Sequence, residues 1–215
     1  MRSRSLFAVI ALSVCTAGIA TALTFQDKGK EKPVEKGKAA PAAAPAMDPA
    51  MMEAMKKYAT PGAEHKMLES RAGKWKGKGK FWMAPDAPVM ESDVDTEYAM
   101  SMGRYLTDTT HGNMMGEAFE GHGVTGFDNL KKKYVSTWID SSGTGIMAME
   151  GSYDAGTKTM TLTGECPDPV AGKYTPMKMI EKDTDANSFV LEMHCTDTKS
   201  GKLFKCMEIT YTRAK

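Results

Sequence analysis

The sequence is poor in the features that mark several large classes of protein. Its 28 Lys and Arg residues are balanced by 27 Asp and Glu residues, for a net charge of +1, and no basic cluster is interleaved with aromatic residues. This composition lacks the electrostatic footprint of a nucleic-acid-binding protein, so we expect no nucleic-acid partner. The apolar run Leu6–Val14 is shorter than the roughly 20 residues that a membrane-spanning helix needs, so we expect no membrane span.

Aromatic bulk is also scarce. The chain has only seven Phe among its 215 residues, whereas it has nineteen Met, and hydrophobic residues make up 41% of the total, as in a globular protein. Met is an adaptable side chain that fills irregular gaps in protein interiors. We interpret the excess as Met supplying apolar bulk in place of Phe.

Patterns that mark catalytic or metal sites are missing as well. The four histidines, at positions 65, 111, 122 and 194, are scattered, and no two stand at metal-ligand spacing. No serine lies in a nucleophile-elbow motif, and nothing in the spacing of the acidic residues fixes a pair of carboxylates for glycoside chemistry. We therefore predict no catalytic residue, no metal-binding residue and no cofactor.

The N-terminus has the pattern of an export signal. Arg2 and Arg4 precede the apolar run, and Ala20-Thr21-Ala22 supplies the small residues of a cleavage site. We expect a signal peptide over residues 1–22 and a periplasmic or secreted protein after cleavage near Ala22.

A lipoprotein signal is the alternative for the same segment. Leu12-Ser13-Val14-Cys15 resembles a lipid-attachment box, in which Cys15 would carry a lipid anchor. Val14 is larger than the residue usually found before a lipidated cysteine, and we therefore favour cleavage near Ala22.

The segment after the signal differs in composition from the rest of the chain. Between positions 26 and 50 there are five Lys, seven Ala and four Pro and no aromatic residue. Such a segment buries too little apolar surface to offset the entropy of ordering it. We expect a disordered Lys/Ala/Pro-rich linker over residues 23–47.

Two short helices are predicted between this linker and the body of the chain, over residues 48–72. Asp48-Pro49 has the pattern of an N-cap followed by proline in the first turn, and Thr60-Pro61 repeats it. Apolar residues then recur at helical spacing until Gly73, which ends the second helix.

From Gly73 the periodicity changes from helical to alternating, which is typical of β-strands. Tyr134, Ser136 and Trp138 share one face of such a run, and the residues between them face the other way. Turn residues separate the runs, with no helical pattern between them. We count about ten strands, which predicts a mainly β protein with a closed antiparallel up-and-down barrel over residues 73–215, since closure removes the exposed edges of so large a sheet.

A series of short motifs extends from about residue 61 to the end of the chain. In order they are His65-x-x-Leu68, Gly73-x-Trp75-x-Gly77, Met102-Gly103-Arg104-Tyr105-Leu106, Phe119-Glu120-Gly121, Gly126-Phe127-Asp128, Trp138-Ile139-Asp140-Ser141 and Met207-Glu208-Ile209-x-Tyr211-x-Arg213. The series resembles the bacterial family called domain of unknown function 1579. The resemblance brings no activity with it, and the abundant Met and the Cys residues are not part of the family pattern.

The start of the first strand, Gly73-Lys74-Trp75, is similar to the start of lipocalin-like (calycin) barrels, where the Trp closes one end of the barrel. In those barrels an Arg near the end of the last strand packs over the indole, and Arg213 holds the matching place. The resemblance therefore implies a lipocalin-like barrel closed by Trp75 and Arg213 through cation–π attraction.

Three cysteines follow the predicted signal peptide. With Ser200-Gly201 as the centre of a hairpin, Cys195 and Cys206 are predicted to lie directly opposite each other, within reach of a disulfide in an oxidising compartment. Cys166 is left over, either buried as a small apolar residue or available for pairing.

Aromatic residues of the predicted strands are the candidates for a ligand site. An internal pocket for an apolar ligand would be lined by Trp75, Tyr98, Tyr134, Trp138 and Phe189. His122 joins them because it stands between two glycines, where a backbone approaches a ligand closely. The alternative is a barrel filled by its own side chains, since β-periodicity does not distinguish a filled interior from an empty one. We expect a non-catalytic barrel that binds a small apolar or amphipathic ligand.

Two other functions stay open at this point. One is a small envelope hydrolase or isomerase that uses interior acidic residues and His122. The other is a periplasmic copper-handling protein, because several Met residues stand two apart and would present their thioethers on one face of a strand. These pairs are Met100/Met102, Met147/Met149 and Met177/Met179. Their dispersal along the chain favours apolar packing over a metal site.

Overall fold

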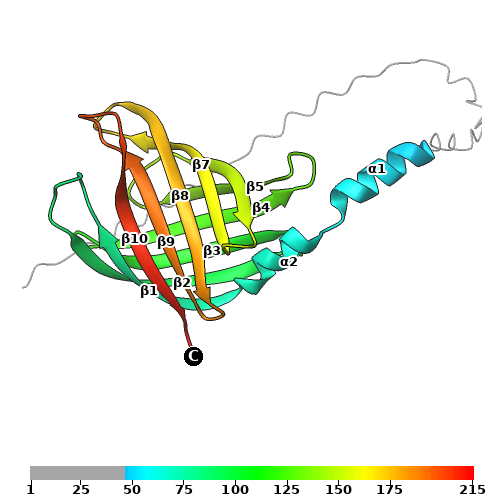
Figure 1. Cartoon of the computed structure of the whole chain (residues 1–215), viewed down its shortest axis with the longest axis horizontal. Helices are drawn as coiled ribbons and strands as arrows, with labels where there is room; N and C mark the ends of the chain where they lie inside the picture. The colour runs from blue at the N-terminus through cyan, green and yellow to red at the C-terminus, as the bar shows by residue number, and fades with distance from the viewer. Residues whose placement is uncertain (1–46) are drawn as a thin grey trace, which may run out of the picture. The chain divides into compact units, whose positions relative to one another are not determined.

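A computed structural model describes residues 47–215 of the chain (Figure 1). The segments predicted as signal peptide and linker, residues 1–22 and 23–47, lie outside the described residues except for Met47. Two helices, α1 (Pro49–Ala59) and α2 (Ala63–Ser70), precede ten strands. The strands are β1 (Gly73–Phe81), β2 (Met90–Ser101), β3 (Tyr105–Met114), β4 (Glu117–Asp128), β5 (Lys133–Asp140), β6 (Met147–Asp154), β7 (Thr159–Asp168), β8 (Lys173–Asp185), β9 (Ser188–Thr196) and β10 (Leu203–Arg213). Neither helix has the length and apolar character that a membrane crossing requires.

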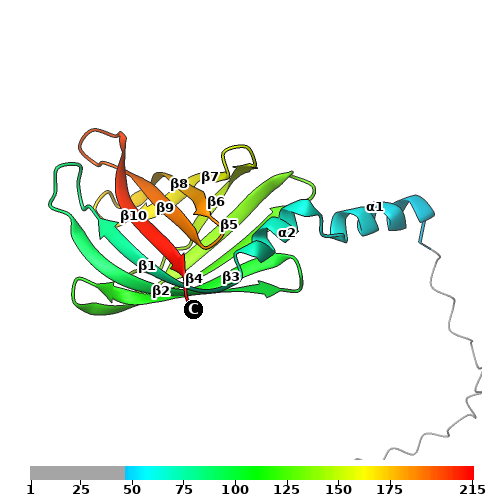
Figure 2. The same ribbon diagram turned by 60° about the horizontal axis from the view of Figure 1, so that its bottom comes forward.

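The ten strands form one closed barrel in which each strand is antiparallel to its neighbours along the chain. Closure is made by β1 and β10, which pair from Trp75 opposite Arg213 to Phe81 opposite Met207 (Figure 2). The up-and-down barrel of about ten strands predicted from the alternating pattern is therefore confirmed. Within residues 47–215, closure leaves no barrel strand with a free edge for edge-to-edge aggregation.

Side-chain alternation gives the barrel an inner and an outer face. On β5, Tyr134 and Ser136 are buried in the interior, whereas Thr137 and Ile139 are exposed on the outside. The same period of two runs through the other strands, so a residue's place in the sequence decides whether it can reach the interior.

The up-and-down order divides the connections between two ends of the barrel. The end that we call the closed end holds α2 and the hairpins β2–β3, β4–β5, β6–β7 and β8–β9. The opposite end, which we call the open end, holds the loops 82–89, 115–116, 141–146, 169–172 and 197–202. Helix α2 contacts β2, β3 and β4 and buries Leu68 and His65.

Helix α1 begins where the side chain of Asp48 accepts a hydrogen bond from the backbone N–H of Ala50 at 2.8 Å. None of its residues is buried. Its C-terminal end is nevertheless tied to the barrel, because Arg104 and Asn129 each donate a 2.8 Å hydrogen bond, to the carbonyls of Ala59 and Tyr58 respectively. Side chains of the barrel thereby satisfy carbonyl groups that a helix end leaves free.

The closed end is packed around Trp75, which is 2% exposed. The Arg213 guanidinium lies 4.3 Å from the centre of the Trp75 ring and donates to the carbonyls of Ala72 at 2.7 Å and Ser70 at 2.9 Å. On its other side, Trp75 meets Phe189 edge-on with ring centroids 4.9 Å apart. The last strand thus holds the segment after α2 against the barrel.

A disulfide joins Cys195 on β9 to Cys206 on β10, with their Cα atoms 5.7 Å apart. The direct opposition of these residues does not hold, because the hairpin is centred between Lys199 and Ser200, so that Cys195 pairs with Phe204. Cys206 itself lies in a β-bulge, which shifts the register between Lys205 and Met207. An extra residue in one strand changes the pairing beyond it. Cys166 is free and half-buried on β7.

Removing the disulfide should destabilise the barrel. In the double variant Cys195→Ser/Cys206→Ser we expect the free energy of unfolding to fall by about 3 kcal/mol, because the bond restricts the unfolded chain. Urea denaturation of the oxidised proteins measures the difference, with Cys166→Ser as the matched control. Equal stability of the oxidised wild type and the double variant would contradict the bond.

Candidate ligand-binding cavity

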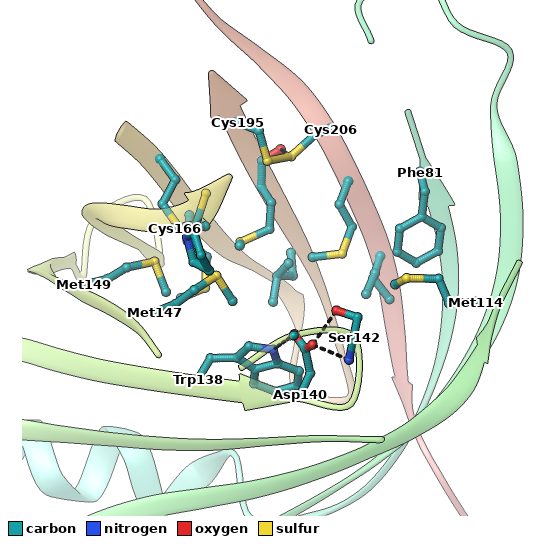
Figure 3. Close-up of a pocket in the computed structure, with 18 of the residues that line it drawn as sticks. Phe81, Met114, Trp138, Asp140, Ser142, Met147, Met149, Cys166, Cys195 and Cys206 are labelled. Carbon is teal, nitrogen blue, oxygen red and sulfur yellow. Dashed lines mark hydrogen bonds between the residues drawn. A yellow bond between two sulfur atoms is a disulfide. The ribbon is translucent and has the colours of Figure 1, made fainter. Parts of the chain in front are cut away.

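A cavity of about 1450 Å³ occupies the barrel interior. Its lining runs from Leu68 and Arg71 at the closed end to the loops of the open end and includes residues of all ten strands. Figure 3 shows part of this lining, including Trp138, Met147 and Met149. Small-molecule pockets in proteins usually measure roughly 300–1,000 Å³. The side chains of the barrel therefore do not fill it.

Methionine is the most prominent residue of the cavity wall, and the set below is called the methionine wall. Twelve of the nineteen methionines line the cavity: Met67, Met83, Met90, Met114, Met115, Met147, Met149, Met160, Met177, Met179, Met193 and Met207. Their thioethers give an apolar surface whose shape adapts easily, because the side chain is unbranched and flexible.

Two of the three predicted methionine pairs point into this cavity. Met147 and Met149 on β6 line it, as do Met177 and Met179 on β8, because residues two apart on a strand share a face. The third pair is divided, since Met102 lies in the β2–β3 turn with a φ of 54° and is 72% exposed. Within residues 47–215, no group of three or more His, Cys, Asp or Glu side chains is placed to hold a metal ion.

Trp138 gives the wall an aromatic surface near the open end. Its indole stacks on Phe119 with ring centroids 6.5 Å apart, and its Nε1 donates to Oδ2 of Asp140 at 2.8 Å. The Asp140 carboxyl also accepts the backbone N–H of Ser142 at 2.9 Å (Figure 3). Gly121 makes room for the indole, because a Cβ at this position would lie 2.1 Å from the ring. These contacts fix the orientation of Trp138 toward the cavity.

Four polar residues near the closed end line the cavity and form what we call the cavity floor: Arg71, Tyr98, Asp108 and Glu181. Tyr98 on β2 lies directly opposite Asp108 on β3. The Arg71 guanidinium lies 2.8 Å from Oδ1 of Asp183 and 3.5 Å from Oε2 of Glu181. The same guanidinium lies 3.8 Å from the centre of the Phe189 ring, which ties the floor to the packed closed end.

Burial shifts the protonation of the acidic groups on the floor. Burial, reinforced by the negative charge of Glu181, raises the pKa of Asp108 from 3.8 to about 7, with a smaller opposing effect from His122. Burial also raises the pKa of Glu181, and the positive charge of Arg71 opposes that shift. The pKa of Tyr98 is raised in the same way, by burial first and by neighbouring negative charge second. Near neutral pH, Asp108 is therefore partly protonated.

The aromatic residues predicted to contact a ligand are divided between the cavity and the closed end. Tyr98 and Trp138 line the cavity. Trp75 and Phe189 belong to the packed closed end and do not line it. Tyr134, 4% exposed, packs edge-on against a neighbouring aromatic ring and is also absent from the lining. The sequence pattern therefore does not distinguish aromatic residues that close the end of the barrel from aromatic residues that line its cavity.

His122 lies on the outer face of the barrel, away from the cavity. Its Nε2 is 2.8 Å from Oε1 of Glu120, and its Nδ1 is 3.2 Å from Oγ1 of Thr109. The reason is alternation: Gly121 and Gly123 face inward, so the residue between them must face outward. The ligand contact predicted for His122 therefore has no counterpart in the cavity lining.

Sequence patterns do not single out Asp108, Glu181 or Arg71. Asp108 stands between Leu106 and Thr110, which are both inward and buried. A charged residue at an inward position of a strand was therefore the sequence feature that could have identified Asp108 as a candidate site residue. Arg71 follows α2 and offers no comparable pattern.

The raised pKa of Asp108 predicts a pH-dependent stability. The native state keeps the Asp108 proton up to about pH 7, whereas the unfolded chain loses it near 3.8, so the free energy of unfolding falls as pH rises between these values. In Asp108→Asn this loss disappears, and the variant should gain stability relative to wild type with rising pH, by as much as about 4 kcal/mol. Urea denaturation at several pH values measures the difference; a difference that is constant with pH would contradict the shift.

Comparison with known proteins adds two structural neighbours and a family. No curated protein matches the chain. The crystal structure of Rv2717c from M. tuberculosis matches with a TM-score of 0.57 and 14% identity, covering 73% of this chain and 100% of that chain. The S-type phycobiliprotein lyase CPES from Guillardia theta matches with a TM-score of 0.50 and 10% identity, covering 72% of this chain and 99% of that chain.

At these identities the two structures share the fold with this chain. The family assignment comes from the sequence itself, over helix α2 and all ten strands of the barrel. The family model described as protein of unknown function (DUF1579) matches residues 60–213, and the chain therefore belongs to this family.

Proposed function

We propose that this protein is an exported, lipocalin-like barrel that binds a small apolar or amphipathic ligand and catalyses no reaction. The cavity of about 1450 Å³ is the observation that carries the proposal. Protein interiors are normally packed as densely as organic crystals, and empty volume costs stability. A barrel with no ligand to bind would gain stability if larger side chains filled this space.

The chemistry of the lining favours an apolar ligand. The lining is mainly apolar, with the methionine wall and Trp138 among its residues, while the charged side chains lie at the cavity floor or near the open end. An apolar lining with a few placed polar groups is the usual composition of a small-molecule site. Flexible thioethers suit a ligand with a hydrocarbon chain or a flat ring, because they can adjust to either.

Export is supported by two features that lie far apart in the chain. The first 22 residues have the three-part pattern of a signal peptide. The Cys195–Cys206 disulfide is of a kind that persists outside the reducing cytosol.

A hydrolase or isomerase has weaker support. No histidine among the described residues lines the cavity, and His122 faces outward. The interior carboxyls of Asp108 and Glu181 therefore have no histidine beside them in the cavity, although a hydrolase or isomerase of the kind considered would use His122 together with interior acids. The likeness to a phycobiliprotein lyase, at 10% identity, concerns the fold and does not bring an activity.

Partly filling the cavity should weaken the binding of an apolar probe. Met149 lies in the wall at 4% exposure, and in Met149→Trp the indole would occupy cavity volume. We expect the Kd for N-phenylnaphthylamine, an uncharged fluorophore, to rise at least about tenfold, the equivalent of about 1.4 kcal/mol. Fluorescence titration measures the effect.

Ala148→Trp is the matched control, because Ala148 precedes Met149 on the same strand and is exposed on the outer face. This variant should bind the probe like the wild type. No fluorescence increase with wild type, or equal weakening in the two variants, would overturn the proposed function.

Export predicts a defined N-terminus for the mature protein. The intact mass of protein purified from its native cells should correspond to a chain that begins at Leu23, because the small residues before it form the cleavage site. Ala22→Trp should block this cleavage. A mature chain that keeps residues 1–22 would contradict export by this route, and an acylated chain beginning at Cys15 would identify the lipoprotein alternative.

A further inference from the structure

The cavity floor holds two polar groups that the protein leaves without a hydrogen-bond partner. Tyr98 is only 9% exposed, and its hydroxyl makes no hydrogen bond with any residue between 47 and 215. Asp108, directly opposite on the neighbouring strand, likewise has no side-chain hydrogen bond within this range. Neither group is fully enclosed, because every fully buried side-chain oxygen and nitrogen within residues 47–215 has a hydrogen-bond partner. Because both side chains line the cavity, a bound molecule is in a position to pair with them.

The charges of the floor are also unbalanced. Arg71 is the one cationic residue of the floor as the structure describes it, and its guanidinium pairs with Asp183 at 2.8 Å and with Glu181 at 3.5 Å. Asp108 forms no salt bridge with any described residue. An ionised carboxyl in an apolar interior is costly unless a positive group accompanies it. The floor therefore favours the arrival of a second cation.

On the side toward β4, the Asp108 carboxyl lies against the backbone of a glycine, Gly123. It pairs across the sheet with Gly123 on β4, and a Cβ at that position would lie 2.2 Å from Oδ1 of Asp108. Any other residue at Gly123 would displace the carboxyl. With glycine there, no β4 side chain at this position covers the acid, and it borders the cavity directly.

We propose that Tyr98, Asp108 and Glu181 form a binding site for the protonated nitrogen of an amphipathic amine, whose apolar part lies along the methionine wall. The inference rests on the proposed ligand-binding function and narrows it to a class of ligand. Asp108 accepts a charge-assisted hydrogen bond from the ammonium group, and the Tyr98 hydroxyl accepts a second N–H. Glu181 adds attraction over a longer distance.

The same groups disfavour other head groups. A carboxylate ligand is repelled by the excess of acidic side chains on the floor. An alcohol forms only neutral hydrogen bonds with the floor. A charge-assisted hydrogen bond in a protein is about twice as strong as a neutral one.

Affinity for the amine should depend on pH. Because the pKa of Asp108 is raised to about 7, the carboxyl must lose its proton to pair with an ammonium group, and binding strengthens as pH rises from about 5 to about 8. The titratable and charged groups around Asp108 are Glu181 on β8, Tyr98 on β2, Tyr211 on β10, His122 on β4 and Arg71 after α2.

Three probes with the same hydrocarbon chain test the site: decylamine, decanol and decanoate. Displacement of N-phenylnaphthylamine gives a Kd for each, at concentrations below micelle formation. At about pH 8 we expect the Kd of decylamine to be at least about tenfold lower than that of decanol, with decanoate weakest. In Asp108→Asn the amine and the alcohol should agree within about threefold.

Asp95→Asn is the matched control. It removes the same charge from the outer face, where Asp95 pairs with Lys76 at 2.7 Å, and it should keep the preference for the amine. The thermal unfolding midpoint checks that each variant is folded. Should Asp108→Asn fail to fold, the wild-type pH series decides: an amine-to-alcohol preference that does not rise from about pH 5 to about pH 8 would overturn the site.

The remaining outcomes separate this inference from the proposed function. Equal affinity of wild type for decylamine and decanol would overturn the amine site while leaving a ligand-binding barrel. A preference for the amine that survives in Asp108→Asn would also overturn it. Failure of the fluorophore and all three probes to bind would overturn both proposals.

Discussion

The pairing of β1 with β10 is the constraint on which the rest of the structure depends. Once these strands meet, every inward side chain is enclosed, and its size decides whether the space around it becomes core or cavity. At the closed end, Phe189 and Tyr211 stack with ring centroids 4.6 Å apart and, with Trp75, fill the cross-section. Farther along, many inward positions hold flexible methionines, and the interior stays open.

Most of the fold that could be predicted from the sequence follows from the alternation of inward and outward residues. It predicts strands, their approximate number and closure, because each follows from local pattern and from the cost of exposed edges. It does not predict which side chains meet inside. Glu181 reaches the floor beside Asp108 only after the barrel closes, and the bulge at Cys206 follows from no argument about a hairpin centre. For His122 the two sequence signals disagree: alternation places it on the outer face, where the structure has it, whereas its flanking glycines suggested contact with a ligand.

The acidic residues of the cavity floor lower the stability of the fold, although they suit the proposed ligand site. Apolar side chains at the floor would pack without a desolvation cost, yet the chain places acidic side chains there. Arg71 connects these acidic side chains to the packed core, because its guanidinium contacts both the Phe189 ring and the Asp183 carboxyl. Polar groups anchored to packed core, away from the loops of the open end, are held in place by their neighbours, and such preorganisation would lower the entropy cost of binding the proposed ligand. Charged residues at inward positions depart from the usual rule of an apolar interior, and such departures are typical of functional sites.

The methionine wall carries a chemical sensitivity that a wall of leucine or isoleucine would lack. Each thioether can be oxidised to a sulfoxide, which turns an apolar surface polar, and the change is reversible by methionine sulfoxide reductases. With twelve such side chains around one cavity, peroxide in the surroundings would progressively make its apolar lining polar. Binding of an apolar ligand, as proposed for this barrel, would therefore depend on how strongly oxidising its surroundings are.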